Sequence, residues 1–131
     1  MILGGVLLAV LANLILGTIY YSPAVLGKPW MKLTGAGPDK MKKDQMIFLM
    51  AGGALLALIN AGILALLMPQ YEVSSYSQAL LFGGILWFGF MMPTVFLNNM
   101  YQMKPFRLSV IDSGFQLVSI LAMSVILYLF M

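Results

Sequence analysis

Long apolar stretches separated by short polar ones dominate the chain. Four of them, at about residues 2–21, 46–68, 77–97 and 108–130, have the length of ~20 residues that a helix needs to cross a hydrocarbon core. Asp112 is the one charged residue inside any of these stretches. Because charged side chains are costly in lipid, the pattern predicts an all-α membrane protein, a single domain over residues 1–131 built as a four-transmembrane-helix bundle.

The composition supports lipid as the main solvent. Hydrophobic residues make up 62% of the chain, charged residues 8%, and the mean hydropathy is +0.98. A soluble domain carries about 25% charged residues, and a chain of 14.4 kDa has too little interior to bury such an apolar surplus.

The basic residues are distributed unevenly along the chain. All seven lie in the segment 22–45 or between the third and fourth stretches, whereas the connection 69–76 carries Glu72 and no basic residue. The positive-inside rule then predicts a cytoplasmic loop at 22–45 and both termini outside, in a multi-pass protein of the cell (inner) membrane. We expect the basic side to contact anionic lipid headgroups, and we expect no nucleic-acid partner. The residues are Lys28, Lys32, Lys40, Lys42, Lys43, Lys104 and Arg107.

Local signals define the connections between the spans. Gly27, Pro29, Gly35 and Gly37 predict that the segment after the first span is irregular. Ser75 and Gln78 have capping-box spacing and predict the start of the third helix.

Small residues recur every fourth position in the first two spans. Such stripes let helices approach closely in lipid, where packing and interhelical hydrogen bonds drive association. They predict helix contacts, either within the chain or in a homo-oligomer. The packing residues are Gly5, Ala9 and Gly17 in the first span and Gly53, Ala57 and Ala61 in the second.

Pro93 interrupts the third span. Its ring would clash with the carbonyl of residue 89, which is a glycine and leaves room for a bend. A kinked helix at Gly89 and Pro93 is the simpler interpretation, and a moving gate is the alternative.

The fourth span carries one polar face. Asp112, Gln116 and Ser119 follow each other at steps of four and three residues, and Asp112 lies about 7–8 Å along the helix from Arg107. In the structural interpretation, Asp112 accepts hydrogen bonds from Asn98, Asn99 or the basic residues of the interface. In the functional one, this face lines a polar path or ion site for a proton or cation, together with Asn13, Asn60 and Asn98.

Residues 17–30, Gly-Thr-Ile-Tyr-Tyr-Ser-Pro-Ala-Val-Leu-Gly-Lys-Pro-Trp, resemble the G-x-x-W-Y-S-P-x-x-F-G-K-x-W signature of a bacterial membrane family, domain of unknown function 1761. Tyr20 and Leu26 depart from it, since Trp and Phe are usual there. Residues 87–94, 98–99 and 111–114 are similar too. The resemblance implies a four-helix membrane protein and no particular activity. The matching motif residues are Tyr21, Ser22, Pro23, Gly27, Lys28 and Trp30.

The chemistry available to the chain is limited. It has no cysteine and no histidine, which removes thiolates, the commonest metal ligand and the usual general base. We therefore expect no enzyme activity, no metal site and no cofactor. A structural or accessory membrane protein that assembles through its small-residue helix faces is the favoured hypothesis. A small oligomeric transporter or channel for a proton, cation or small solute, with a path around Asp112, is the alternative.

Overall fold

A computed structural model describes residues 2–37 and 40–131, and within these ranges the secondary structure is helical, without strands. A long first helix is followed by a short one, α2, and then by three further membrane-length segments. The third of the four long segments is subdivided by a π-helical turn. The elements are α1 (Ile2–Tyr20), α2 (Gly27–Thr34), α3 (Lys43–Gln70), α4 (Tyr76–Leu86), η2 (Trp87–Met91), α5 (Met92–Tyr101) and α6 (Phe106–Leu129).

Four helical segments are long and apolar enough to cross a membrane. They are Ile2–Tyr20, Lys43–Gln70, Tyr76–Tyr101 and Phe106–Leu129. The predicted all-α fold with four membrane-length helices is therefore confirmed. The second and third segments extend beyond the predicted apolar stretches, because a helix continues into flanking polar residues that hydropathy leaves out. The side of the membrane on which the termini lie stays a prediction.

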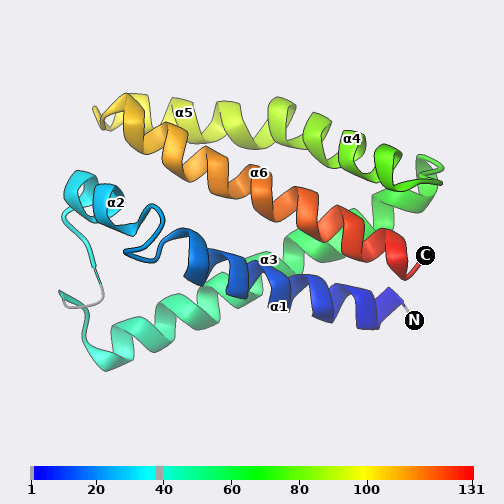
Figure 1. The fold of residues 1–131 in the computed structure, drawn as a ribbon, viewed down its shortest axis with the longest axis horizontal. Helices are drawn as coiled ribbons and strands as arrows, with labels where there is room; N and C mark the ends of the chain where they lie inside the picture. Colours follow the sequence, from blue (N-terminus) through cyan, green and yellow to red (C-terminus); the bar gives the residue numbers. More distant parts are fainter. Residues whose placement is uncertain (1, 38–39) are drawn as a thin grey trace.

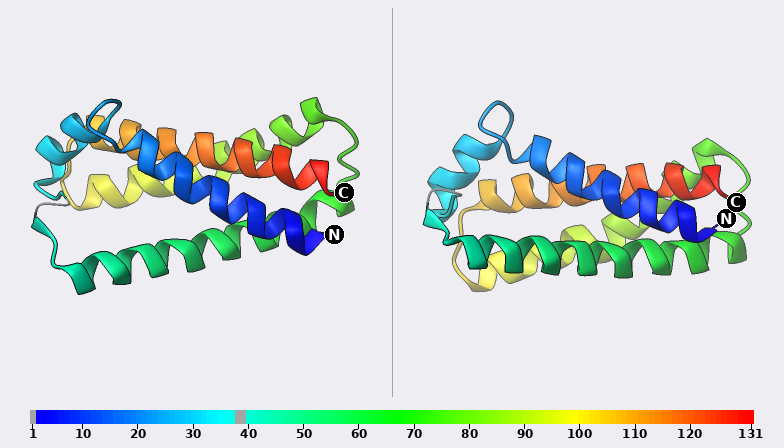
Figure 2. Two further views of the ribbon diagram at one scale, coloured as in Figure 1. Left: turned by 60° about the horizontal axis from the view of Figure 1, so that its bottom comes forward. Right: turned by 90° about the horizontal axis from the view of Figure 1, so that it is seen from below.

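α6 is the central helix of the bundle. It packs against α1, α4 and α5, while α3 packs mainly against α1 (Figure 1). α2 and the loop between α5 and α6 lie at one end, which we call the basic end because the lysines and Arg107 gather there (Figures 1 and 2). The start of α1, the end of α6 and the loop between α3 and α4 lie at the opposite end.

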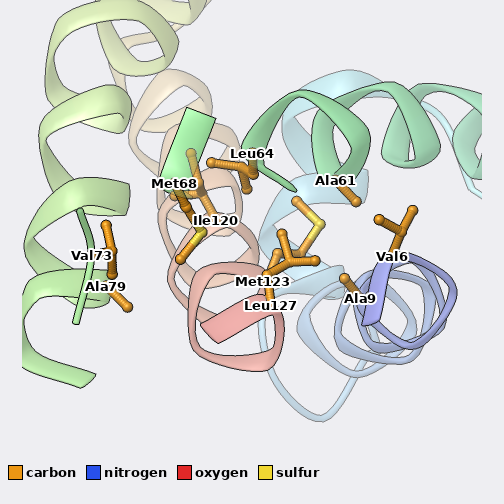
Figure 3. Close-up of a cluster of buried hydrophobic side chains, with 10 residues drawn as sticks. All are labelled: Val6, Ala9, Ala61, Leu64, Met68, Val73, Ala79, Ile120, Met123 and Leu127. Carbon is orange, nitrogen blue, oxygen red and sulfur yellow. The ribbon is translucent and has the colours of Figure 1, made fainter. Parts of the chain in front are cut away.

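The apolar core is concentrated toward the opposite end. Figure 3 shows side chains from α1, α3, α4 and α6 meeting around Met68, Met123 and Leu127, all of which are fully buried. The buried residues of α3 are confined to its second half, from Ala57 to Met68. Its first half diverges from α1 toward the basic end (Figures 1 and 2). The apolar core therefore stabilises mainly the opposite end, and the basic end depends on other contacts.

The prediction that the segment after the first span is irregular is wrong for residues 27–34, which form α2. The glycines and the proline mark the ends of this helix. Gly27 is its first residue and Pro29 lies in its first turn, where a missing N–H costs little. Gly35 follows its last residue with φ of +72°, a left-handed conformation, and donates its N–H to the Met31 carbonyl. α2 places Trp30 beside the end of α1.

The start of α4 follows the predicted capping pattern in part. The Gln78 N–H donates to Ser75 Oγ at 3.1 Å, as an N-cap requires. The Gln78 side chain does not return to the Ser75 backbone, however; its Oε1 accepts from the backbone N–H of Ser74 at 2.7 Å.

The third long segment contains a π-helical turn immediately before Pro93. The Met92 N–H donates to the Trp87 carbonyl, five residues back, and η2 spans Trp87–Met91. Pro93 then lies in the first turn of α5, where it removes no needed donor. The Thr94 hydroxyl donates to the Phe90 carbonyl at 2.6 Å. The extra residue of the π turn is the local device that accommodates the proline.

Candidate functional site

Asp112 is held by a tyrosine from the first helix. The phenol of Tyr21, directly after α1, donates to Asp112 Oδ1 at 2.8 Å. Asp112 lies in the second turn of α6, near the basic end, and both side chains are half-buried. A phenol keeps its proton at neutral pH, so Tyr21 is the donor and the Asp112 carboxyl group the acceptor. The pair joins the end of α1 to the start of α6.

Tyr20 makes a second connection between the same helices. Its hydroxyl donates to the Ile111 carbonyl at 2.6 Å. The approach depends on Gly114, because a Cβ there would lie 2.6 Å from the Tyr20 oxygen. The motif at residues 17–30 thus meets residues 111–114, another stretch of the resemblance, in space.

Three aromatic rings, those of Tyr20, Trp30 and Phe115, pack around Tyr21 of the Tyr21–Asp112 pair. Tyr21 contacts Trp30 and Phe115 with ring centroids 5.4 Å apart in each case, and Tyr20 lies 5.1 Å from Tyr21. Tyr20 and Phe115 are also 5.4 Å apart. Tilted and edge-to-face pairs at these separations are favourable. The cluster packs the ends of α1 and α2 onto α6.

A tight turn between α1 and α2 fixes the position of Tyr21. The Gly27 N–H donates to the Ser22 carbonyl at 2.8 Å, and the Leu26 N–H donates to the Tyr20 carbonyl at 3.0 Å. Ser22 Oγ donates to the Ile19 carbonyl at 2.7 Å. A Cβ at Gly27 would lie 2.3 Å from the Tyr21 carbonyl oxygen, so only glycine fits. Of the other motif residues, Pro23 and Lys28 are exposed.

Deeper in the bundle, Ser119 of α6 is paired as well. Its hydroxyl donates to the Asn13 side-chain oxygen of α1, and Ser119 is buried. Gln116 lies half-buried between the two pairs along α6. The polar face of the fourth span therefore faces α1.

The predicted hydrogen bonds to Asp112 from Asn98, Asn99 or the basic residues of the interface are absent from the described residues, where Tyr21 is the donor instead, and this choice of donor is wrong. The Asn99 amide donates to Ser109 Oγ at 3.1 Å instead, whereas Asn98 is exposed. Sequence spacing favoured a partner from the neighbouring helix of the hairpin, but the tertiary structure brings Tyr21 into that place. Asn60 is exposed on α3 and lines a separate hollow between α3 and α4. It therefore does not join Asn13 and Asp112.

The small-residue stripes are largely covered within the chain. Gly5 lies under Phe130, Gly17 lies under Phe115, and Ala9 and Ala61 belong to the apolar core. Ala57, the remaining packed position of the α3 stripe, is also buried. Gly53 differs from these residues, since no atom lies within 4 Å of where its Cβ would be.

An open cleft of about 540 Å³ explains the bare surface of Gly53. It lies between the second half of α1, α2 and the diverging first half of α3, and Phe115 forms part of its wall. Asn13 and Tyr21, the partners of Ser119 and Asp112, also line it. A second hollow of about 750 Å³ adjoins it toward the basic end and shares Trp30, Met41 and Leu49. Both volumes lie in the range of ~300–1,000 Å³ typical of small-molecule sites.

Sequence reasoning did not single out Tyr21 as the partner of Asp112, nor the cleft. One usable sign of the pair existed, because Tyr21 ends the first apolar stretch and Asp112 lies about one turn into the fourth, so both lie near the basic end. The cleft had no comparable sign, since it arises from the angle between α1 and α3. Within the described residues, no group of three His, Cys, Asp or Glu side chains is placed to hold a metal ion.

Comparison with curated proteins and with solved structures found no match to this chain. Comparison with protein-family models gave one match over residues 5–128, which includes the tyrosine turn, the aromatic cluster, Asp112 and the cleft. That match covers nearly the whole chain, and the protein therefore belongs to the family described as protein of unknown function (DUF1761).

Proposed function

We propose that the protein is a structural or accessory membrane protein without enzyme activity. The observation that supports this role is the use of the polar face of α6 in hydrogen bonds to α1. Asp112 accepts from Tyr21, and Ser119 donates to Asn13. Polar groups inside a membrane are stabilised by such interhelical bonds, so the face has a structural use that needs no ligand.

We further propose that the basic end faces the cytoplasm of a cell (inner) membrane, against anionic headgroups. The lysines of α2 and of the segment 40–43 are exposed at this end, as the positive-inside rule expects of a cytoplasmic side. A homo-oligomer is part of the same proposal. Because the small-residue faces of α1 and α3 are covered within the chain, copies would meet through uncovered glycines such as Gly62 and Gly84.

The proposed orientation can be tested by cysteine labelling, because the native chain has no cysteine. Gln70→Cys and Gln102→Cys place one thiol at each end of the bundle, both at exposed positions. We expect a membrane-impermeant maleimide to label Gln70→Cys in intact spheroplasts, and Gln102→Cys only after permeabilisation. The reverse labelling pattern would contradict the orientation.

Transport is the second candidate, and one observation favours it. The open cleft reaches Asn13 and Tyr21, so a solute inside it would touch the groups that hold Ser119 and Asp112. A proton or cation path would then run along the interface between α1 and α6, and Asp112 would carry the charge.

Flux measurements in proteoliposomes distinguish the two candidates. Under the structural proposal, proton and small-cation fluxes through the wild type equal those of empty vesicles, and Asp112→Asn changes nothing. Asp44→Asn is the matched control, because Asp44 is an exposed acid at the basic end. A wild-type flux that Asp112→Asn abolishes and Asp44→Asn preserves would replace the structural role with transport.

A further inference from the structure

The cleft between α1 and α3 is built in two levels. At the depth of the spans its walls are mainly apolar side chains, with Asn13, Thr18 and Tyr21 as the polar exceptions. The adjoining hollow toward the basic end is lined by Asp44 and Gln45 as well as Phe48. Trp30 belongs to both levels and lies where they meet. The site is thus mainly apolar at both levels, with one acid and one amide side chain at its mouth.

The described lining residues of both hollows include no lysine, but exposed lysines lie close to them in the sequence. α2 carries Lys28 and Lys32, and the segment leading into α3 carries Lys40, Lys42 and Lys43, all exposed. Asp44 is the one acid of this stretch within the described residues. Lys40 donates to the Gly35 carbonyl at 2.9 Å. The other four lysines, which we call the rim, are exposed at the same end of the bundle. The arrangement attracts an anion at headgroup level.

We propose that the cleft binds one anionic phospholipid, with an acyl chain between α1 and α3 and its phosphate among the lysines of the rim. This inference rests on the membrane placement of the proposed function and adds a defined lipid site to it. The charges select the headgroup, and the apolar walls around Gly53 hold the chain. Trp30 lies at the boundary, the usual position of an aromatic residue at a membrane interface.

The size of the cleft favours a lipid chain over a helix of a second copy. One 5.4 Å turn of a helix ~10 Å wide already fills roughly 420 Å³, whereas the apolar level measures about 540 Å³ in total. Little more than one helical turn would fit. A flexible acyl chain is slender enough to occupy the same space along its length.

The two tryptophans of the chain provide the measurement. Trp30 lines the cleft, whereas Trp87 donates to the Ser113 carbonyl and lines a different hollow, against α6. Trp87→Phe leaves Trp30 as the reporter and Trp30→Phe leaves Trp87. If Trp87→Phe folds poorly, the Trp30 signal can be obtained instead by subtracting the fluorescence of Trp30→Phe from that of the wild type.

The protein is first reconstituted in phosphatidylcholine vesicles that contain a rising fraction of brominated phosphatidylglycerol. In a second series, phosphatidylcholine carries the bromine label and phosphatidylglycerol is unlabelled. We expect brominated phosphatidylglycerol to quench Trp30 about fivefold more strongly than brominated phosphatidylcholine at the same mole fraction. This factor corresponds to the attraction of one lysine to an anionic surface. Trp87 quenching should follow the mole fraction of either lipid.

Two adjacent glycines supply matched variants. Gly53 lines the cleft and Gly52 does not, and a Cβ at either position has no neighbour within 4 Å. Gly53→Leu should place a side chain inside the cleft and lower the preference at Trp30, whereas Gly52→Leu should preserve it. Lys28→Gln combined with Lys32→Gln should reduce the preference of Trp30 quenching for the anionic lipid, while a lipid chain still occupies the cleft.

The outcomes separate this inference from the proposed function. Equal quenching of Trp30 by both labelled lipids, or equal effects of Gly53→Leu and Gly52→Leu, would overturn the lipid site and leave the membrane placement intact. Absence of quenching at Trp87 as well as Trp30 would overturn the membrane placement itself. Loss of Trp30 quenching together with a dimer would place a second copy in the cleft and also overturn the lipid site.

Discussion

Tyr21→Phe is expected to lower the free energy of unfolding by about 1–2 kcal/mol, because it removes the donor that Asp112 accepts from. Asp112→Ala should cost a similar amount. The double variant should cost less than the sum, since each single change already breaks the same bond. Reversible unfolding in mixed detergent micelles measures all three, and the non-additive part gives the coupling between the two residues.

Tyr101→Phe is the control for this cycle. Tyr101 lies at the same end of the bundle, and its side chain is 82% exposed. Removing its hydroxyl should change stability by less than about 0.5 kcal/mol. Costs of Tyr21→Phe and Asp112→Ala that simply add would contradict the pairing seen between α1 and α6.

Gly27→Ala is expected to have the second large effect, a loss of about 1–3 kcal/mol, in the range seen when a well-packed site is overfilled. The new methyl group would lie 2.3 Å from the Tyr21 carbonyl oxygen and 2.6 Å from the Ser22 carbonyl carbon, both backbone atoms. The turn must open to relieve the clash, and α2 moves with it. The same unfolding assay, with Trp30 fluorescence as a second readout, records both consequences.

Gly52→Ala is the matched control, because a Cβ there meets nothing within 4 Å and the residue lies inside α3. Alanine is the better helix former by about 1 kcal/mol, so this variant should be at least as stable as the wild type. If Gly27→Ala and Gly52→Ala shift stability equally, glycine is not required at the turn.

The helices themselves were predictable because a membrane imposes one strong rule, about 20 apolar residues for each span. Asp112, the one charged residue inside the predicted apolar stretches, was equally predictable as a residue in need of a partner. Its partner was not, because the relative rotation of four helices determines which side chain faces it. Tyr21 lies 91 residues away in the chain, and no periodicity within either helix specifies that contact.

α2 and η2 illustrate a second limit. Glycine and proline mark helix ends as well as loops, so Gly27, Pro29 and Gly35 fit an irregular segment and a short bounded helix equally well. Pro93 predicted a kink in the third span. The form of this irregularity, one extra residue in a π turn, depends on how the flanking helices pack. The divergence of α3, and hence the cleft, follows from packing at the opposite end around Met68.

The central place of α6 has a consequence for biosynthesis. A membrane protein emerges from the ribosome amino terminus first, and α6 is the last long helix in the chain. The acceptors for Tyr20 and Tyr21, as well as the donor to Asn13, all belong to it. The groups of α1 therefore stay without these partners until α6 has been synthesised. During that interval, a nascent chain exposes polar side chains that α6 later pairs, so insertion of α6 is the step that completes the hydrogen bonds between the two helices.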